Sequence, residues 1–240
     1  MKLPFVMAEG IDGSGKGTAI EALKEWAFSK RLKVFDLRSY WKDNDNIPEF
    51  EEVKDYDVII SSQPTYSLVG RGLREEMIKD NKRAYSAVSI AHAFSLDREI
   101  LYRKLLIPAL KNKKIIFQER GIVSSLVYQP VEGVQLQETM SLPGNKLSLQ
   151  YLQGIIFIIT VSPEAATERL ALRTKKDDSI YENLLFLKKL DERYRAEWLK
   201  QLLENQGSEV VYLDNNPPKT EQELKEEVIQ AWEEKYDSLK

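Results

Sequence analysis

Hydrophobic residues along the chain form short β-branched and aromatic runs, separated by longer stretches with helical periodicity. Most of the short runs show little alternation of apolar and polar positions, as parallel strands buried on both faces do. We therefore predict strands at Pro4–Ala8, Lys33–Leu37, Val58–Ser61, Lys114–Gln118, Ile155–Val161 and Glu209–Leu213. Helices are predicted near residues 16–30, 68–80, 84–111, 163–173, 181–205 and 220–236. This order predicts a three-layer α/β fold around a mostly parallel sheet of five or six strands.

Three segments interrupt this regular pattern. Residues 41–57 are acidic and polar, which predicts a loop or an insertion. A second loop is predicted over about residues 130–147, where two prolines and two glycines occur. The charged stretch Lys175–Ser179 splits the surrounding helical pattern. Because no internal repeat or linker is found, we expect residues 1–240 to form a single domain.

Composition excludes several classes of protein. The 240 residues include 35 Lys and Arg against 38 Asp and Glu, a formal net charge of −3, and no cysteine. Without cysteine there is no disulfide, thiolate zinc site or cysteine nucleophile, and the slight acidity argues against a protein that coats nucleic acid. No uncharged run approaches the roughly 18 residues of a membrane span, and acidic residues follow the N-terminal apolar run too closely for a secretory signal. We therefore expect a soluble cytoplasmic protein with neither nucleic acid nor membrane as its partner.

A glycine-rich turn joins the first predicted strand to the first helix and is the strongest chemical signal in the chain. Its spacing is Gly-x-x-x-x-Gly-Lys, followed here by Gly17 and Thr18. Glycines let the backbone N–H groups approach a phosphate closely, and a lysine at this place reaches the β- and γ-phosphates. Gly17 stands where the pattern usually has Ser or Thr, so Thr18 is the candidate hydroxyl for Mg²⁺. A glycine-rich turn with a surface lysine is the structural alternative. The predicted phosphate-binding residues are Gly10, Asp12, Gly13, Ser14, Gly15, Lys16, Gly17 and Thr18.

Further motifs follow this turn in a fixed order. They are Phe94-Ser95-Leu96-Asp97-Arg98, then Glu119-Arg120 with Ser124 and Tyr128-Gln129, and finally a basic helical segment with Arg169, Arg173 and Asp191-Glu192-Arg193-Tyr194. In this ordered set the chain resembles the thymidylate kinases, which are P-loop nucleoside monophosphate kinases. The resemblance implies transfer of the γ-phosphate of ATP to a deoxynucleoside monophosphate, with dTMP as the acceptor. It also implies Mg²⁺ and a homodimer.

The resemblance also implies roles for individual residues. Asp12 would bind the 3′-hydroxyl of the acceptor sugar, Phe94 would stack on the pyrimidine, and Arg98 would contact the edge of that base. Glu119 would hold Mg²⁺ together with Thr18. The implied catalytic cations are Lys16, Arg120 and Arg173, the last in a lid over about residues 173–180. The remaining residues implied for the acceptor are Gln63, Pro64, Arg120, Ser124, Tyr128 and Gln129.

The residue pattern gives partly independent support and leaves alternatives open. Phe94 and Arg98 are four residues apart, so they project from one face of a helix, but an apolar stripe on the same helix also allows Phe94 to be core. Glu119 and Arg120 end an apolar strand at the edge where parallel sheets bind ligands, although a surface salt bridge is the alternative. The single histidine, His92, has no partner motif and is expected to be an ordinary helical residue.

One departure from the family concerns the strand that usually ends in Thr-Arg-Glu-Pro, whose arginine grips the acceptor phosphate. Here Ser62 and Gln63 replace the arginine and glutamate. Arg71 or Arg74 supplies the missing charge in one interpretation, and both have ordinary helix-surface roles in the other. The extra run Lys33–Leu37 either adds an edge strand or displaces the predicted second strand.

Other functions remain open on sequence alone. A deoxynucleoside kinase would need a carboxylate base, for which Glu119 or Glu9 are candidates. A kinase for another nucleotide and a non-catalytic nucleotide-binding module are further alternatives. Against a P-loop switch GTPase, Asn145-Lys146-Leu147-Ser148 lacks the Asp of the Asn-Lys-x-Asp guanine motif.

Overall fold

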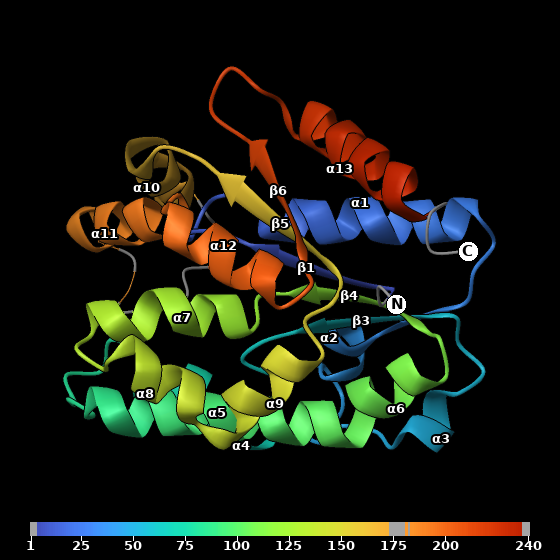
Figure 1. Cartoon of the computed structure of the whole chain (residues 1–240), viewed down its shortest axis with the longest axis horizontal. Helices are drawn as coiled ribbons and strands as arrows, with labels where there is room; N and C mark the ends of the chain where they lie inside the picture. The colour runs from blue at the N-terminus through green and yellow to red at the C-terminus, as the bar shows by residue number, and fades with distance from the viewer. Residues whose placement is uncertain (1–3, 173–180, 182, 237–240) are drawn as a thin grey trace.

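The strands of the protein form a parallel sheet in the order β2-β3-β4-β1-β5-β6 (Figure 1). The computed structural model describes residues 4–172, 181 and 183–236. The strands are β1 (Phe5–Glu9), β2 (Val34–Asp36), β3 (Val58–Ser62), β4 (Ile115–Glu119), β5 (Ile155–Thr160) and β6 (Glu209–Asp214). Each predicted strand is present, and the predicted fold class is confirmed. The run at residues 33–37 adds edge strand β2 beside β3 instead of displacing β3.

Helices connect and cover these strands. They are α1 (Lys16–Ser29), α2 (Leu37–Tyr40), α3 (Phe50–Val53), α4 (Leu68–Gly72), the π-helical turn η1 (Leu73–Met77), α5 (Ala87–Leu101), the π-helical turn η2 (Tyr102–Leu106), α6 (Ile107–Lys111), α7 (Ile122–Val131), α8 (Leu136–Ser141), α9 (Pro143–Gln150), α10 (Pro163–Ala171), α11 (Leu184–Tyr194), α12 (Glu197–Asn205) and α13 (Glu221–Tyr236). Helix α7 was not predicted from the sequence. The stretch predicted as one helix over residues 181–205 is interrupted between α11 and α12.

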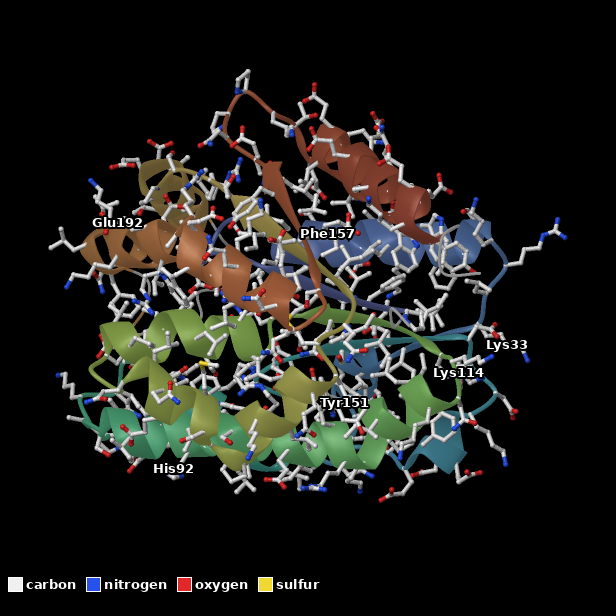
Figure 2. All side chains as sticks on the ribbon, in the orientation of Figure 1. Lys33, His92, Lys114, Tyr151, Phe157 and Glu192 are labelled. Carbon is white, nitrogen blue, oxygen red and sulfur yellow. The ribbon has the colours of Figure 1, made fainter. Side chains whose placement is uncertain are left out.

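Two hydrophobic layers follow from the alternation of side chains along each strand. On one face, Val6 and Phe117 pack against α1 and α13, where Trp26 and Trp232 meet edge to face. Figure 2 shows Phe157 of β5 on this side, between the sheet and α1. On the other face, Met7 belongs to a larger core beneath α5, α6, α7, α11 and α12. Both faces of the sheet are therefore covered, which explains the unbroken apolar strands in the sequence.

The prediction of a loop over residues 130–147 is wrong, because helices α8 and α9 occupy most of this segment. Pro143 stands in the first turn of α9, where its missing N–H leaves no helical hydrogen bond unmade. Gly144 allows α9 to approach α5 closely, since a Cβ there would lie 1.9 Å from the carbonyl oxygen of Ser95. The proline and glycine therefore mark a helix start and a tight helix contact.

The segment 41–57 is mostly irregular, as predicted, but it contributes to the core. Trp41, Ile47, Phe50 and Val53 are buried in the larger hydrophobic layer, and α3 forms a short helix with a capping box. The proposed lid, including Arg173 and Lys175–Ser179, lies outside the described residues. Within the described ranges, none of the helices combines the length and apolar character that crossing a bilayer requires.

Candidate active site

The glycine-rich turn leaves β1 and enters α1 through conformations that require glycine. Gly10 has a φ of 139°, and a Cβ there would lie 2.3 Å from the carbonyl oxygen of Ile159. Gly15 has a φ of 103° and precedes the first residue of α1. The first turn of α1 contains no acidic residue of its own that would offset the partial positive charge of this helix end. The arrangement can bind an anion such as phosphate.

Neighbouring segments hold the turn in place from the side of β6. Asn215, just beyond β6, donates its amide N–H to the carbonyl oxygen of Ser14 at 2.7 Å. Arg169 of α10 donates to the carbonyl oxygens of Asn215 at 2.8 Å and Gly13 at 3.4 Å. These hydrogen bonds hold the backbone of the glycine-rich turn in place without a ligand. Sequence reasoning noted Arg169 as part of a motif but missed Asn215, whose only signal is its place directly after a strand.

Lys16 opens α1 with its side chain folded into the turn. It is only 5 % exposed, and its Nζ donates to the carbonyl oxygen of Ile11 at 2.7 Å. Burial, with a smaller contribution from the nearby Arg120 guanidinium, lowers the pKa of Lys16 to about 7. The nearby carboxylates therefore do not offset the cost of burying the Lys16 ammonium group. A bound phosphate would supply further negative charge beside it.

Arg120 stands directly after β4 and reaches across to the glycine-rich turn. Its guanidinium pairs with the Asp12 carboxylate, and the Tyr128 hydroxyl lies 3.3 Å from Arg120 Nη1 and 3.4 Å from Asp12 Oδ2. Burial acts to lower the pKa of Arg120, but the Asp12 carboxylate together with Tyr128, Tyr194 and Glu9 outweighs it, and the pKa lies well above its usual value. Arg120 has a φ of 60°, a conformation that costs about 1–3 kcal/mol and is concentrated at functional sites. Both side chains of this pair have little exposed surface, unlike the exposed surface salt bridge that the sequence analysis left open.

Glu9 lies behind this unit and ties three elements together. It is fully buried, and it accepts hydrogen bonds from the Ser124 hydroxyl at 2.7 Å, the Ser124 N–H at 3.2 Å and the Tyr194 hydroxyl at 3.0 Å. Each carboxylate oxygen has a donor, and Glu9 does not line the cleft. Its role in the geometry is to join β1 to α7 and α11.

The far wall of the site comes from α5 and the loop after β3. Phe94 is half-buried and lines the cleft, while Ala91 and Leu101 of α5 and Leu105 of η2 are buried among hydrophobic residues. Arg98 is 1 % exposed, and burial lowers its pKa to about 10. The wall therefore offers an aromatic ring next to a buried cation.

Neutral acceptors hold the Arg98 guanidinium. Gln63 Oε1 accepts from Nε at 3.1 Å, and Nη2 donates to the carbonyl oxygen of Gly121 and to the Ser125 hydroxyl, both at 3.0 Å. The Asn145 side-chain oxygen accepts from Nη1. No carboxylate in the described part of the chain forms a salt bridge with Arg98. Its charge is therefore left for a polar ligand edge to neutralise in part.

The loop after β3 is held by Asp97, which is 2 % exposed. Its carboxylate accepts from the Thr65 N–H at 2.9 Å and from the Thr65 hydroxyl at 2.5 Å. Burial raises the pKa of Asp97 despite these hydrogen bonds. The Gln63–Pro64 peptide bond in this loop is cis. Asp97 thereby fixes the loop that carries Gln63 and Pro64 to the helix that carries Phe94 and Arg98.

Oxygen donors suited to a divalent cation lie beside Lys16. Thr18 and Glu119 both line the cleft. A Cβ at Gly17 would meet only Glu119 Oε2, at 4.0 Å, so the place of the usual hydroxyl is open and faces this carboxylate. In the described chain, no cluster of three or more histidine, cysteine or acidic side chains could hold a metal ion alone. One carboxylate and one hydroxyl fit Mg²⁺, which keeps several waters and takes further ligands from substrate phosphates.

These groups share a cleft of about 910 Å³ at the carboxyl ends of the strands. All the predicted site residues line it except Gly10 and Ser14, which lie in the glycine-rich turn, and Arg173, which is not among the described residues. Arg71, Arg74 and Arg169, which the sequence analysis named, also line it. Residues that the sequence analysis did not name line it as well: Arg38, Trp41, Tyr66, Tyr181, Asn215 and Lys219. His92 is exposed on the outer side of α5 (Figure 2) and is not part of the cleft. The structure therefore brings the ordered motifs together at one site.

Comparison with known proteins agrees with this geometry. The family model described as thymidylate kinase matches residues 48–226, which begin after the glycine-rich turn. The thymidylate kinase of Caldicellulosiruptor saccharolyticus is 31% identical over 192 residues, covering 79% of this chain and 80% of that protein. The probable thymidylate kinase of Pyrococcus abyssi is 33% identical over 141 residues, covering 58% of this chain and 57% of that protein.

Among solved structures, the thymidylate kinase of Ehrlichia chaffeensis has the same fold. The two chains superpose with a TM-score of 0.60 at 20% sequence identity, and the match covers 95% of this chain and 97% of the other. The fold is therefore shared over nearly the whole of both chains.

Proposed function

This chain belongs to the thymidylate kinase family, and from that membership we propose that it transfers the γ-phosphate of ATP to dTMP, giving dTDP and ADP. The observation that carries the proposal is one cleft with a phosphate-binding turn on one wall and an aromatic ring on the other. Lys16 and the Arg120–Asp12 pair lie on the first wall, and Phe94 and Arg98 lie on the second. The cleft is at the upper end of the range for ligand sites, which suits two nucleotides better than one.

The proposed reaction makes modest chemical demands on the protein. An oxygen of the acceptor phosphate is already anionic, so it attacks the γ-phosphorus without a strong general base while the bond to the β,γ-bridging oxygen breaks. The protein must bring two anions together and hold them in line. We assign this task to Lys16, Arg120 and Arg173, whose positive charges offset the repulsion.

We propose that Mg²⁺ accompanies ATP and is held by Glu119 and Thr18. When bound, Mg²⁺ neutralises charge on the transferring phosphates. The backbone N–H groups of the glycine-rich turn, from Gly10 to Thr18, enclose the triphosphate, and Lys16 reaches its β- and γ-phosphates.

For the acceptor, we propose that Phe94 stacks on the pyrimidine and Arg98 donates to a carbonyl on its edge. Asp12, oriented by Arg120 and Tyr128, receives the 3′-hydroxyl of the sugar. The residues proposed to enclose the remaining acceptor surface are Gln63, Pro64, Ser124 and Gln129.

A nucleoside kinase is less well supported by the geometry. Such an enzyme would need a carboxylate base beside the sugar hydroxyl, and Glu9 is buried with its oxygens occupied by Ser124 and Tyr194. Glu119 lines the cleft near Lys16, where the proposed metal site lies.

The test is a coupled assay of ADP release with ATP–Mg²⁺ and a panel of acceptors: dTMP, dUMP, dCMP, dGMP, AMP and thymidine. We expect turnover with dTMP above the others and none with thymidine. Turnover with thymidine alone would replace the proposal with a nucleoside kinase, and ATP binding without turnover on any acceptor would indicate a binding module. The Lys16→Ala variant, with its circular dichroism unchanged, should lose turnover.

We also propose a homodimer that acts in the cytoplasm, where nucleotide pools are found. Val88 and Leu96 on α5 are 45 % and 49 % exposed, on either side of the exposed His92, and exposed apolar side chains of this kind are suited to contact with a second copy of the chain. Sedimentation velocity on the wild type and on Leu96→Glu tests this, since the charged variant should sediment as a monomer. A monomeric wild type would reject the dimer.

A further inference from the structure

One polar side chain is buried inside the otherwise apolar strand β4. Gln118 is fully buried and follows the apolar run Ile115–Phe117 near the carboxyl end of the strand. It lies beside Ser61 of β3 and Met7 of β1 in the sheet, and it does not line the cleft. Burying an amide is costly unless its polar atoms are hydrogen-bonded, so the partners of Gln118 indicate its role.

Both ends of the Gln118 amide have partners. Nε2 donates to the carbonyl oxygen of Arg120 at 2.7 Å and to Gln63 Oε1 at 3.3 Å, and Oε1 accepts from the Ser61 hydroxyl at 3.4 Å. Because a backbone carbonyl can only accept a hydrogen bond, the NH₂ group must face Arg120. Gly121 leaves room for this group, since a Cβ there would lie 2.8 Å from Gln118 Nε2. The amide therefore directs both donors at residues that line the cleft, Gln63 and Arg120.

The first of these hydrogen bonds supports the wall formed by Phe94 and Arg98, which we call the base wall. Gln63 Oε1 accepts from Arg98 Nε at 3.1 Å as well as from Gln118 Nε2. Two donors thus hold the carbonyl end of the Gln63 side chain. Without Gln118, the Arg98 guanidinium alone would hold it, and both side chains would be less well fixed.

The second hydrogen bond supports the backbone where β4 ends. Arg120 has a φ of 60°, and a left-handed residue of this kind persists only where its surroundings hold it. Its N–H donates to the carbonyl oxygen of Ala8 at 2.9 Å, and its own carbonyl accepts from Gln118. The next carbonyl, that of Gly121, accepts from Arg98 Nη2 at 3.0 Å. The same stretch of backbone therefore carries the Arg120 guanidinium and one of the acceptors that hold Arg98.

We propose that Gln118 is a positioning residue that sets the distance between two groups on the acceptor nucleotide, Arg98 at the base and Arg120 at the phosphate. This assignment rests on the proposed function, because it takes the base and the reacting phosphate of one nucleotide to lie against these two cations. Gln118 touches neither part of the nucleotide and acts through Gln63 and the Arg120 backbone. Loss of its donors should therefore disturb base recognition and phosphate transfer together.

The test compares the wild type with Gln118→Met, which keeps the length of the side chain and removes both donors. Titration calorimetry without ATP gives the preference for dTMP over dCMP, as the ratio of their dissociation constants. These two probes share the sugar and the phosphate and differ in the base. The second quantity is kcat with dTMP at saturating ATP–Mg²⁺.

Thr160→Val is the matched control. Thr160 is a buried polar residue at the carboxyl end of β5, and its hydroxyl donates to the carbonyl oxygen of Leu213 at 3.4 Å. It does not line the cleft. The control therefore removes a buried hydrogen bond from the same sheet without touching Gln63 or Arg120, and urea unfolding measures the loss of stability in both variants.

We expect the wild type to bind dTMP more tightly than dCMP. Gln118→Met should reduce this preference about tenfold, which is the effect of one lost hydrogen bond, and should lower kcat about 10- to 100-fold, because small displacements of positioning groups slow a reaction strongly. The dissociation constant of ATP should stay unchanged, since none of the Gln118 hydrogen bonds reaches the glycine-rich turn. Thr160→Val should keep the wild-type preference and kcat. A purely structural role of Gln118 predicts instead that both variants lose stability alone.

Every other outcome is also decisive. Wild-type preference and kcat in Gln118→Met, a change in only one of the two quantities, or an equal fall in Thr160→Val overturns the assignment. So does an affinity for ATP that falls as much as that for dTMP. If Gln118→Met does not fold, Gln118→Glu decides under the same expectations, since it still accepts from Ser61 and lacks the N–H donors.

Failure of the proposed function can be told apart from failure of this assignment. Wild-type protein that prefers dTMP in binding but never phosphorylates it refutes the proposed function, and the binding preference of Gln118→Met then decides the assignment. Wild-type protein with no preference for dTMP over dCMP refutes both.

Discussion

Lys16 gives the sharpest quantitative prediction, because its charge depends on whether a phosphate is bound. In the protein without ligand, burial first and Arg120 second lower the pKa of Lys16 to about 7, although Asp12, Glu119 and Glu9 act in the opposite direction. A triphosphate brings several negative charges to the same place, so its binding must raise this pKa again. We therefore expect ATP–Mg²⁺ binding to be accompanied by proton uptake.

The magnitude follows from the pKa. At pH 8, one unit above the pKa, about nine-tenths of Lys16 is neutral in the free protein, so binding should take up about 0.9 proton. At pH 6 the uptake should be about 0.1 proton. Since the free state has the lower pKa, rising pH favours the free state, and affinity should fall about tenfold per pH unit above pH 7. The free energy of unfolding should change in the opposite direction and increase from pH 7 towards 10.5, because unfolded Lys16 returns to its ordinary pKa of 10.5.

Titration calorimetry at pH 6, 7 and 8, in two buffers with different ionisation enthalpies, measures the protons taken up on binding. The Lys16→Arg variant is the control, since a guanidinium stays protonated throughout this range and should show no uptake from this position. Wild-type protein that binds ATP–Mg²⁺ at pH 8 without taking up a proton, or uptake of equal size in Lys16→Arg, would refute the reasoning.

The remaining predictions concern the glycine-rich turn, the base wall and the half-buried Glu132. Gly10→Ala should lower the free energy of unfolding by at least about 3 kcal/mol, because the new Cβ meets the carbonyl oxygen of Ile159 at 2.3 Å. Gly17→Ala should raise the free energy of unfolding by about 0.5–1 kcal/mol, because a Cβ there meets only Glu119 Oε2 at 4.0 Å. Urea unfolding of the two variants and the wild type measures both changes. Phe94→Ala should weaken dTMP binding by about 10- to 100-fold with ATP binding unchanged, so equal weakening of both in calorimetry would remove the stacking role. Burial raises the pKa of Glu132 to about 7 in the fold, so its folded state binds a proton more tightly than its unfolded state and stability should decrease as pH rises from about 4.5 through 7. Glu132→Gln should remove that part of the decrease, and urea unfolding at pH 5 and 8 should show a smaller difference for the variant than for the wild type.

Signals local in the sequence predicted the glycine-rich turn and the strands. Gly10, Gly15 and Lys16 are close in sequence, so their spacing alone encodes a turn that presents N–H groups to an anion. The strands β1 and β5 are apolar on both faces, and this property is visible without knowing their neighbours. The stretch 130–147 is mostly helical although its prolines and glycines predicted a loop, because proline also occurs in the first turn of helices and glycine also allows close contact between helices.

Tertiary structure alone decided which charged groups are available for chemistry. Arg71 and Arg74 are indistinguishable in sequence, yet Arg71 pairs with the Asp45 carboxylate, whereas Arg74 is held by the Pro64 carbonyl and the Tyr66 ring and forms no salt bridge with a described carboxylate. The reason is that local pattern determines the backbone conformation, whereas the energy of a charge depends on burial and on partners that are distant in the chain.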